Sequence, residues 1–294
     1  MATSPIRNTG YFKGATVFIS GASRGIGLAI AKKLAKDGAN IVIAAKTAEA
    51  HPKLPGTIYT AAKEIEAEGG RALPLVVDVR DEQSAKKAVD EAVQKFGGID
   101  VLINNASAIS QSPTVDTEMK RYDLMHSVNG RGTFLLSKLC IPHLKKSRKA
   151  AILNISPPLD MAARWFAPHP AYTASKFLMS IYALGMAEEL KADGIAVNCL
   201  WPRGVIWTAA VENVLSKGHD VQKFCRKPEI MADAAYLILS NKQTGQFLID
   251  DTFLAEKGGV RNFDYYAYDP SAPLRMDFFV PDYIPDPCPN KAKL

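Results

Sequence analysis

The sequence has few cysteines, and they are not arranged to hold a metal or a disulfide framework. Cys140, Cys199, Cys225 and Cys288 are widely separated, and none of them belongs to a C-x-x-C pair. The five histidines show no metal-ligand spacing either. We therefore expect free thiols in a reducing compartment and no metal site.

Long apolar runs and targeting segments are also missing. No run approaches the roughly 18 apolar residues that a membrane helix needs, and residues 1–14 lack the apolar core of a secretory signal. We expect a soluble protein with no integral membrane segment that is not secreted.

The positive charge is not concentrated in any one segment. The net charge is +6, but Lys and Arg are interspersed with Glu and Asp, whereas a nucleic-acid binder usually clusters them. The pattern favours a solvated surface and no nucleic-acid partner. It leaves open that part of the excess meets phosphate groups of a ligand.

Short β-rich runs alternate with amphipathic stretches along most of the chain. The expected strands cover residues 16–20, 40–45, 73–77, 101–104, 151–155, 195–200 and 246–249, and the expected helices 26–36, 58–68, 81–96, 121–145 and 172–190. This order predicts an α/β fold with a doubly wound parallel sheet of about seven strands and helices on both faces. Its ligand should lie at the carboxyl ends of the strands.

The composition changes after about residue 260, so we expect one domain over residues 1–260 and an extended tail over 261–294. In the tail, Tyr and Phe interleave with six prolines: Pro270, Pro273, Pro281, Pro285, Pro287 and Pro289. Such a segment should carry little regular structure. We expect it to pack its aromatic side chains on the domain or on a neighbouring subunit.

A glycine-rich turn separates the first strand from the first helix. Glycines let such a turn tighten and let a pyrophosphate approach the backbone, where the helix N-terminus offers free N–H groups. The candidate contacts are Gly21, Ser23, Arg24, Gly25, Ile26 and Gly27.

The end of the second strand distinguishes between the nicotinamide cofactors. An NAD enzyme usually places an acid there for the ribose 2′-hydroxyl, but this chain has Ala44-Ala45-Lys46-Thr47. Lys46, assisted by Arg24, would pair with a 2′-phosphate, which predicts NADP(H). The alternative is that Lys46 is an ordinary solvated lysine. Asp78, after the third strand, is placed to touch the adenine.

Tyr172 and Lys176 are four residues apart at the start of a helix, so they share one face. Neither titrates near neutral pH on its own. A nearby ammonium group would lower the pKa of the tyrosine toward the working range. The pair therefore predicts proton transfer.

Together the glycine turn, Asn104-Asn105-Ala106, Asn129, Tyr172 with Lys176, and Pro202 resemble the short-chain dehydrogenase/reductase family over about residues 10–250. The resemblance implies a Rossmann-type fold with Tyr172 as proton donor or acceptor and Lys176 as its partner. Asn129 would hold a water in the proton relay. The implied cofactor contacts include Lys46, Asp78, Val79, Asn105, Ala106, Lys176 and Pro202.

Residues 41–47, 51–54, 105–109 and 152–158 resemble a narrower group within that family. Longer members of the group append a sterol-carrier domain, for which we expect no room in 294 residues.

Two positions depart from the family pattern. The serine that normally polarises the substrate carbonyl falls on Pro157, so either Ser156 takes that role or the enzyme lacks the hydroxyl. Arg203 replaces a glycine after Pro202 and either lies near the nicotinamide end of the cofactor or faces solvent.

Aromatic residues cluster where substrate should bind, namely Trp165, Phe166, Trp201 and Trp207. Either they belong to the core or they line a site for a lipophilic substrate such as a fatty acyl chain, a long-chain alcohol or aldehyde, or a sterol. His169 could line the same site, but we expect it on the surface.

The leading hypothesis is an enzyme that transfers hydride reversibly between NADP(H) and such a carbonyl or alcohol. The alternative is an NADP(H)-binding regulatory protein with little or no turnover, which Pro157 favours. We expect a homo-oligomer through the helices at 121–145 and 172–190. Ala292-Lys293-Leu294 resembles a peroxisomal address read by an import receptor, with the cytosol or mitochondrion as alternatives.

Overall fold

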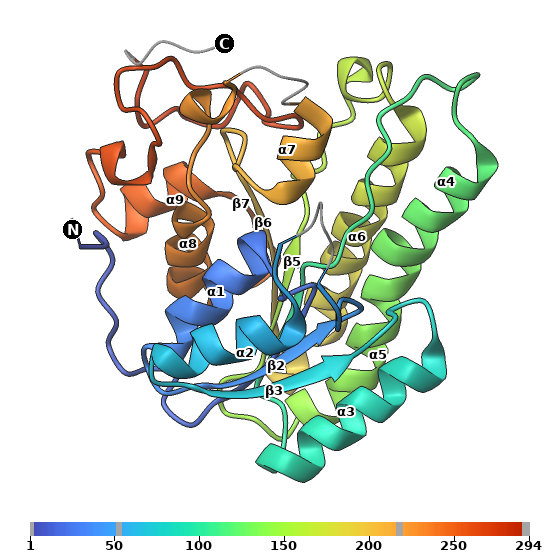
Figure 1. The fold of residues 1–294 in the computed structure, drawn as a ribbon, viewed down its shortest axis with the longest axis vertical. Coiled ribbons are helices and arrows are strands. Elements are labelled where there is room, and N and C mark those ends of the chain that lie inside the picture. The colour runs from blue at the N-terminus through green and yellow to red at the C-terminus, as the bar shows by residue number, and fades with distance from the viewer. Residues whose placement is uncertain (1–2, 51–54, 216–219, 290–294) are drawn as a thin grey trace.

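Residues 3–50, 55–215 and 220–289 are described by a computed structural model of the chain. Its centre is a seven-stranded, fully parallel sheet in the order β3-β2-β1-β4-β5-β6-β7 (Figure 1). The order reverses between β1 and β4, which creates the crevice where such sheets bind ligands. The strands are β1 (Thr16–Ser20), β2 (Asn40–Ala45), β3 (Arg71–Val76), β4 (Val101–Asn104), β5 (Ala151–Ile155), β6 (Ala196–Trp201) and β7 (Phe247–Ile249).

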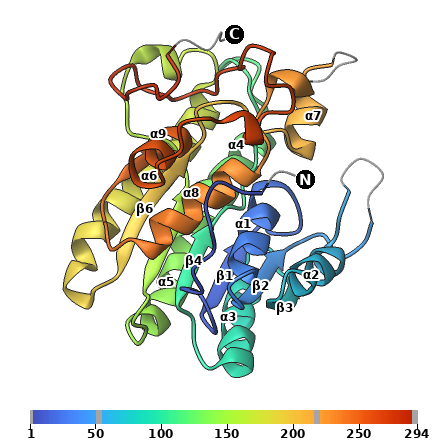
Figure 2. The same ribbon diagram turned by 90° about the vertical axis from the view of Figure 1, so that its left-hand side faces the viewer.

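Helices cover both faces of the sheet, which confirms the doubly wound Rossmann-type fold (Figures 1 and 2). One face carries α1 (Gly25–Ala35), α2 (Ile58–Ala67), α8 (Glu229–Ser240) and α9 (Asp250–Lys257). The other carries α3 (Glu82–Phe96), α5 (Gly132–Leu144) and α6 (Pro170–Glu189). Two further helices are α4 (Met119–Met125) and α7 (Ala209–Leu215). The sequence pattern does not predict α7, α8 or α9.

Local sequence explains several of these boundaries. Every residue of β1, β2 and β4 is buried, because strands in the middle of a parallel sheet are covered on both faces. The Asp81 carboxylate accepts hydrogen bonds from the first free N–H groups of α3, and that helix ends at Gly97 in a left-handed conformation, with φ +87°.

The single helix expected over residues 121–145 is interrupted. A π-helical turn, His126–Arg131, separates α4 from α5. The buried Asn129 lies within this turn, and its side chain both accepts from the Ala108 N–H (2.8 Å) and donates to the Ala108 carbonyl (2.9 Å). A π-helical turn holds one residue more than an α-helical turn, and the hydrophobic periodicity of the sequence does not reveal it. Such turns are frequent at functional sites.

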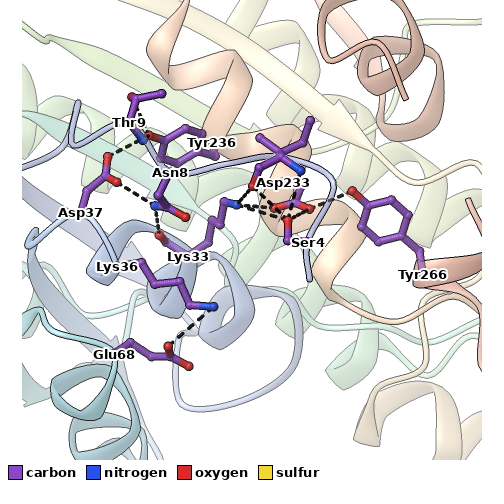
Figure 3. Close-up of polar contacts among 11 residues, drawn as sticks. Ser4, Asn8, Thr9, Lys33, Lys36, Asp37, Glu68, Asp233, Tyr236 and Tyr266 are labelled. Carbon is purple, nitrogen blue, oxygen red and sulfur yellow. Dashed lines mark hydrogen bonds and ion pairs between the residues drawn. The ribbon is translucent and has the colours of Figure 1, made fainter. Parts of the chain in front are cut away.

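The residues before β1 bind to α1 and α8 through a buried polar network (Figure 3). Lys33 of α1 pairs with Asp233 of α8 at 2.8 Å, and both side chains are almost fully buried. The Asp233 carboxylate also accepts hydrogen bonds from the hydroxyls of Ser4 (2.6 Å) and Tyr266 (2.7 Å). A buried pair keeps its charges only when its other polar atoms are satisfied in this way.

The C-terminal segment packs on its own domain, at the end of the molecule that carries α7 (Figures 1 and 2). Residues 203–205 and 275–277 exchange backbone hydrogen bonds, with the Asp277 N–H donating to the Arg203 carbonyl at 2.8 Å. We call residues 275–287 the tail strap. Ala292-Lys293-Leu294 lies outside the described residues, and its reading as an address stays a prediction.

Candidate active site

A cleft of about 440 Å³ opens at the switch point between β1 and β4. The glycine turn forms its floor, with Gly21 at φ +73° and Gly25 at φ +59°. The cleft brings together ten of the predicted cofactor contacts: Gly21, Ser23, Arg24, Gly25, Ile26, Lys46, Asp78, Val79, Asn105 and Ala106.

Close packing behind the turn explains why glycine is required there. A Cβ on Gly27 would lie 2.6 Å from the Asn105 amide nitrogen and 2.8 Å from the Gly21 carbonyl oxygen. That amide donates to the carbonyls of Ser20 and Gly21, both at 3.0 Å. The turn, the helix N-terminus behind it and the open cleft fit a dinucleotide pyrophosphate. The other three predicted cofactor contacts, Gly27, Lys176 and Pro202, do not line this cleft.

The charges at one end of the cleft differ in one respect from those expected from the sequence. No acid is expected beside Lys46, but the Asp78 carboxylate lies 3.1 Å from its ammonium group. Arg80, which sequence reasoning missed, binds the same carboxylate at 2.7 Å. Hydrogen bonds from Arg80, followed by those from Lys46, hold the pKa of Asp78 well below its usual range. With Arg24 the cleft still has three cations to one anion.

Arg24 does not point freely into the cleft. Its guanidinium donates to the carbonyls of Pro55 (3.0 Å) and Gly56 (2.7 Å), so it holds the loop before α2. Burial lowers the pKa of this guanidinium.

Tyr172 and Lys176 lie on the first turns of α6, and both are buried. The Lys176 ammonium group donates to the Ile155 carbonyl at the end of β5 (2.6 Å) and lies 5.1 Å from the centre of the Trp201 ring. Burial lowers its pKa to about 7. Burial, followed by the charge of Asp277, raises the pKa of Tyr172, the opposite direction from that expected from the sequence. The Tyr172 hydroxyl therefore keeps its proton in this setting.

Asn129 is joined to the same helix through Ser175. Its amide donates to the Ser175 hydroxyl (2.9 Å), which donates to the Tyr172 carbonyl (2.7 Å). The π-helical turn thus holds the loop at Ala108 and the start of α6 in register.

Ser156 is fully buried, and its hydroxyl has no hydrogen-bond partner among the described residues. It faces the thiol of Cys199. The Pro157 carbonyl accepts a hydrogen bond from Ser180 at 2.7 Å. Neither Ser156 nor Pro157 lines the cavity beside Tyr172 described next.

A second cavity of about 510 Å³ is lined by Tyr172 and adjoins the cleft at Ala210. Its walls are mostly apolar and come from α6, the end of β6, α7, the tail strap and the segments after β4 and before α8: Ile109, Tyr172, Trp201, Val205, Ala210, Val211, Val221, Phe224, Met276 and Phe278. Three further side chains are polar: Gln111, Arg275 and Asp277. Of the four aromatic residues singled out in the sequence, only Trp201 lines this cavity.

Phe279 is the centre of the aromatic packing around Tyr172. Its side chain is fully buried, although its backbone has φ +66°, a conformation that costs a non-glycine residue about 1–3 kcal/mol. Its ring lies within about 6 Å of the rings of Trp201, Trp165 and Phe177. The strap is therefore part of the site, and no local motif marks it in the sequence.

The expected positions of His169 and Arg203 are wrong. His169 is buried, with its ring 5.6 Å from that of Tyr172. Arg203 neither reaches the nicotinamide end nor faces solvent, because its buried guanidinium pairs with Asp251 at 2.8 Å. It also donates to the Pro285 carbonyl at 2.7 Å. Arg203 therefore holds the tail strap. Its partner, Asp251, is more than 40 residues away in the sequence.

Within residues 3–50, 55–215 and 220–289, no helix is long and apolar enough to cross a bilayer. No cluster of three or more potential ligands that could hold a metal ion occurs in the same part of the chain. No disulfide joins the cysteines there.

Comparison with known proteins gives matches at three levels. The short chain dehydrogenase family model matches residues 15–218. Human hydroxysteroid dehydrogenase-like protein 2 is 60% identical over 278 residues, which cover 94% of this chain but 66% of that protein. The narrower resemblance noted in the sequence is to this group, and it is confirmed. The chain thus spans just under two thirds of the length of this curated relative.

Solved structures share the fold over most of the chain. A short chain dehydrogenase from Mycobacterium thermoresistibile is 47% identical and has a TM-score of 0.88, covering 96% of this chain and all of that one. A short chain dehydrogenase from Mycobacterium paratuberculosis, described as bound to NAD, is 26% identical, with a TM-score of 0.68 over 81% of this chain and 97% of that one.

Proposed function

Because the chain belongs to the short-chain dehydrogenase family, we propose that it is an NADP(H)-dependent oxidoreductase acting on a lipophilic carbonyl or alcohol. The observation that carries the proposal is the position of Tyr172, whose side chain lines an apolar cavity next to the dinucleotide cleft. That cavity would take a fatty acyl, long-chain or sterol-like substrate.

A bound nicotinamide supplies or accepts the hydride. In the reducing direction, the Tyr172 hydroxyl gives its proton to the carbonyl oxygen. Its raised pKa keeps that proton in place until the oxygen becomes basic. Lys176, poised near neutrality by burial, accepts or returns a proton behind it, and Asn129 holds the register of α6.

The preference for NADP(H) is supported by the cations of the cleft. Lys46 and Arg80 pair with the one acid of the lining, Asp78, and Arg24 lines the same cleft. This leaves an excess of two positive charges, and a 2′-phosphate carries about two negative charges. A ribose 2′-hydroxyl would not need them.

The test is turnover of NADPH and of NADH with a panel of long-chain aldehydes, ketones and sterols, in wild type and Tyr172→Phe. We expect NADPH-dependent turnover that falls by about 10²–10⁴-fold in Tyr172→Phe, with NADPH affinity by calorimetry unchanged. Equal use of NADH would overturn the cofactor preference. Activity that survives in Tyr172→Phe would overturn the role of the tyrosine.

A regulatory NADP(H)-binding protein is the second candidate, and the enclosed position of Ser156 favours it. Without a hydroxyl at the family's serine position, the loss of one oxyanion donor costs about 10²–10³ in rate. Tight NADPH binding with no turnover across the panel would support this candidate.

We also propose a homo-oligomer formed through α5 and α6. Phe134, Ile181 and Leu184 on these helices are about half exposed, although they are large and apolar. Analytical ultracentrifugation of wild type and of Phe134→Glu with Leu184→Glu tests this, since the double variant should dissociate.

A further inference from the structure

The cavity beside Tyr172 receives no hydroxyl from the end of β5. Ser156 is fully buried away from it, and Pro157 has no side-chain donor. A carbonyl oxygen beside Tyr172 would therefore lack the second hydrogen bond that stabilises its developing negative charge. Another polar side chain lining the same cavity could supply it.

Asp277 of the tail strap lines the cavity together with Tyr172. Its backbone is fixed, because its N–H donates to the Arg203 carbonyl (2.8 Å), while the next carbonyl, that of Phe278, accepts from the Trp201 indole (2.7 Å). One carboxyl oxygen, Oδ1, accepts from the Phe278 N–H at 2.7 Å. The described residues provide no hydrogen bond to the other oxygen, Oδ2. The carboxyl group is thus held at one oxygen and available at the other.

The surroundings of Asp277 favour its neutral form. Burial, and after it the charge of Asp250, raises its pKa to about 7, although the Phe278 N–H, Lys176 and Arg275 act in the opposite direction. The other titratable groups that face it are Tyr172 and Cys225. Near neutral pH much of this carboxyl group carries an O–H, and a carboxyl kept neutral by an apolar site can donate a hydrogen bond.

We propose that Asp277 is a further catalytic residue, whose protonated carboxyl group donates a hydrogen bond to the substrate carbonyl oxygen in place of the missing serine hydroxyl. This rests on the proposed function. As hydride adds to the carbonyl carbon, the π electrons move onto the oxygen, and the Tyr172 O–H bond breaks to protonate it. Asp277 keeps its own proton throughout. Once ionised, Asp277 repels the charge on that oxygen and the reaction slows.

Kinetics of Asp277→Asn and Asp277→Leu with NADPH and the substrate found in the panel test the role. The asparagine amide still donates a hydrogen bond but does not titrate, and leucine can do neither. We expect kcat for Asp277→Leu to fall about 10²-fold at pH 6, with KM changed only a few-fold. Asp277→Asn should stay within about tenfold of wild type at pH 6 and lose the wild-type decline in kcat above pH 7. Equal kcat values for wild type and Asp277→Leu would overturn the proposal.

Asp282→Asn is the matched control, because Asp282 lies on the same strap but is exposed and pairs with Arg164. It should leave kcat and its pH profile unchanged. NADPH affinity should be the same in all variants, since none of these residues lines the dinucleotide cleft.

A measurement without turnover separates this proposal from the proposed function. The infrared difference between wild type and Asp277→Asn isolates the C=O stretch of the protonated carboxyl group from that of Asp250, and its pH dependence gives the titration directly. We expect the protonated band at pH 6 and its loss between pH 6 and 8. A carboxylate already ionised at pH 6 overturns the role of Asp277 even in an active enzyme. An inactive wild type with a protonated Asp277 overturns the proposed function instead.

Discussion

The dinucleotide cleft and the cavity lined by Tyr172 meet at Ala210, but they are built in different ways. The cleft is lined mainly by residues 21–26, 44–47, 77–80 and 105–108, each directly after a strand of the sheet. The cavity combines the start of α6, the end of β6, α7 and the tail strap, which are distant in sequence. The cleft follows from the topology of the sheet, whereas the cavity depends on how the tail folds back.

The difference extends to the charges that each region holds. The acids and bases of the cleft are partly exposed, as with Lys46 and Asp78, so they can exchange partners with a ligand. Those that hold the strap are almost fully buried, and Arg203 and Arg226 both pair with Asp251. The first region is arranged to bind, and the second to hold the strap in place.

The largest effect should come from releasing the strap. Arg203→Met removes a buried partner of Asp251 and the bond to the Pro285 carbonyl. Breaking a buried pair costs about 3–5 kcal/mol of unfolding free energy, and we expect about 3, because Arg226 still pairs with Asp251. Urea unfolding measures it. Arg164→Met, which breaks the exposed pair between Arg164 and Asp282 on the same strap, should cost under about 1 kcal/mol. Equal losses in the two variants would show that the buried pair does not hold the strap.

The second largest effect should be a loss of NADPH affinity when a single methyl group is added behind the cleft. Gly27→Ala places a Cβ within 2.8 Å of the Gly21 carbonyl oxygen, and relieving such a clash costs about 1–3 kcal/mol. We expect calorimetry to show NADPH affinity lowered about tenfold or more, with the tail strap undisturbed. Gly98→Ala is the control, since a Cβ there meets no atom within 4 Å. Unchanged NADPH affinity in Gly27→Ala would separate the glycine turn from cofactor binding.

The same contrast explains what could be predicted from the sequence. The seven strands were found within about two residues because alternating β and α patterns are local, and the glycine turn is marked by its own residues. The sequence does not reveal the ion pair of Lys46, because Asp78 meets it only when β2 and β3 lie side by side. The position of Lys46 at the end of β2 does not by itself indicate the partner of its ammonium group.

The cavity was the less predictable region. The residues next to Arg203 in the sequence do not indicate that it will be buried and paired with Asp251 at the start of α9. His169 and Phe279 meet only because the strap returns over α6. The composition of the tail suggests that its aromatic side chains pack on the domain, but it does not indicate where. Proline-rich segments have no periodicity that would show which face packs against which element.

A smaller effect should distinguish the two nicotinamide cofactors. Lys46→Ala removes a partly exposed cation from the adenosine end of the cleft. A hydrogen bond to a charged group is worth about 1.5–3 kcal/mol, and exposure favours the lower end, so NADPH affinity should fall about tenfold. NADH affinity should hardly change. The control is Lys86→Ala, which breaks only an exposed pair with Asp90 on α3. A parallel loss of NADH affinity would mean that Lys46 does not recognise the 2′-phosphate.

The smallest effect should be a change of the unfolding free energy with pH, and it should come from Lys176. Lys176 is buried, and its pKa is lowered to about 7 in the folded protein, whereas an unfolded lysine titrates near pH 10.4. Between these values the unfolded chain holds one more proton at this lysine, so Lys176 by itself should raise the unfolding free energy by about 1 kcal/mol per pH unit. Asp277, with its raised pKa, acts in the opposite sense between about pH 4 and 7, so the two windows do not overlap.

Urea unfolding of wild type and Lys176→Met at pH 7.5, 8.5 and 9.5 measures this slope. The control is Lys46→Met, because the side chain of Lys46 is exposed at the cleft and not buried like that of Lys176; it should leave the slope unchanged. Methionine at position 176 fills a similar volume and cannot titrate, so the difference from wild type should shrink as pH rises toward 10. If the two curves stay parallel, Lys176 is charged in the folded protein. It would then act on Tyr172 as a fixed cation, not as a group that exchanges a proton.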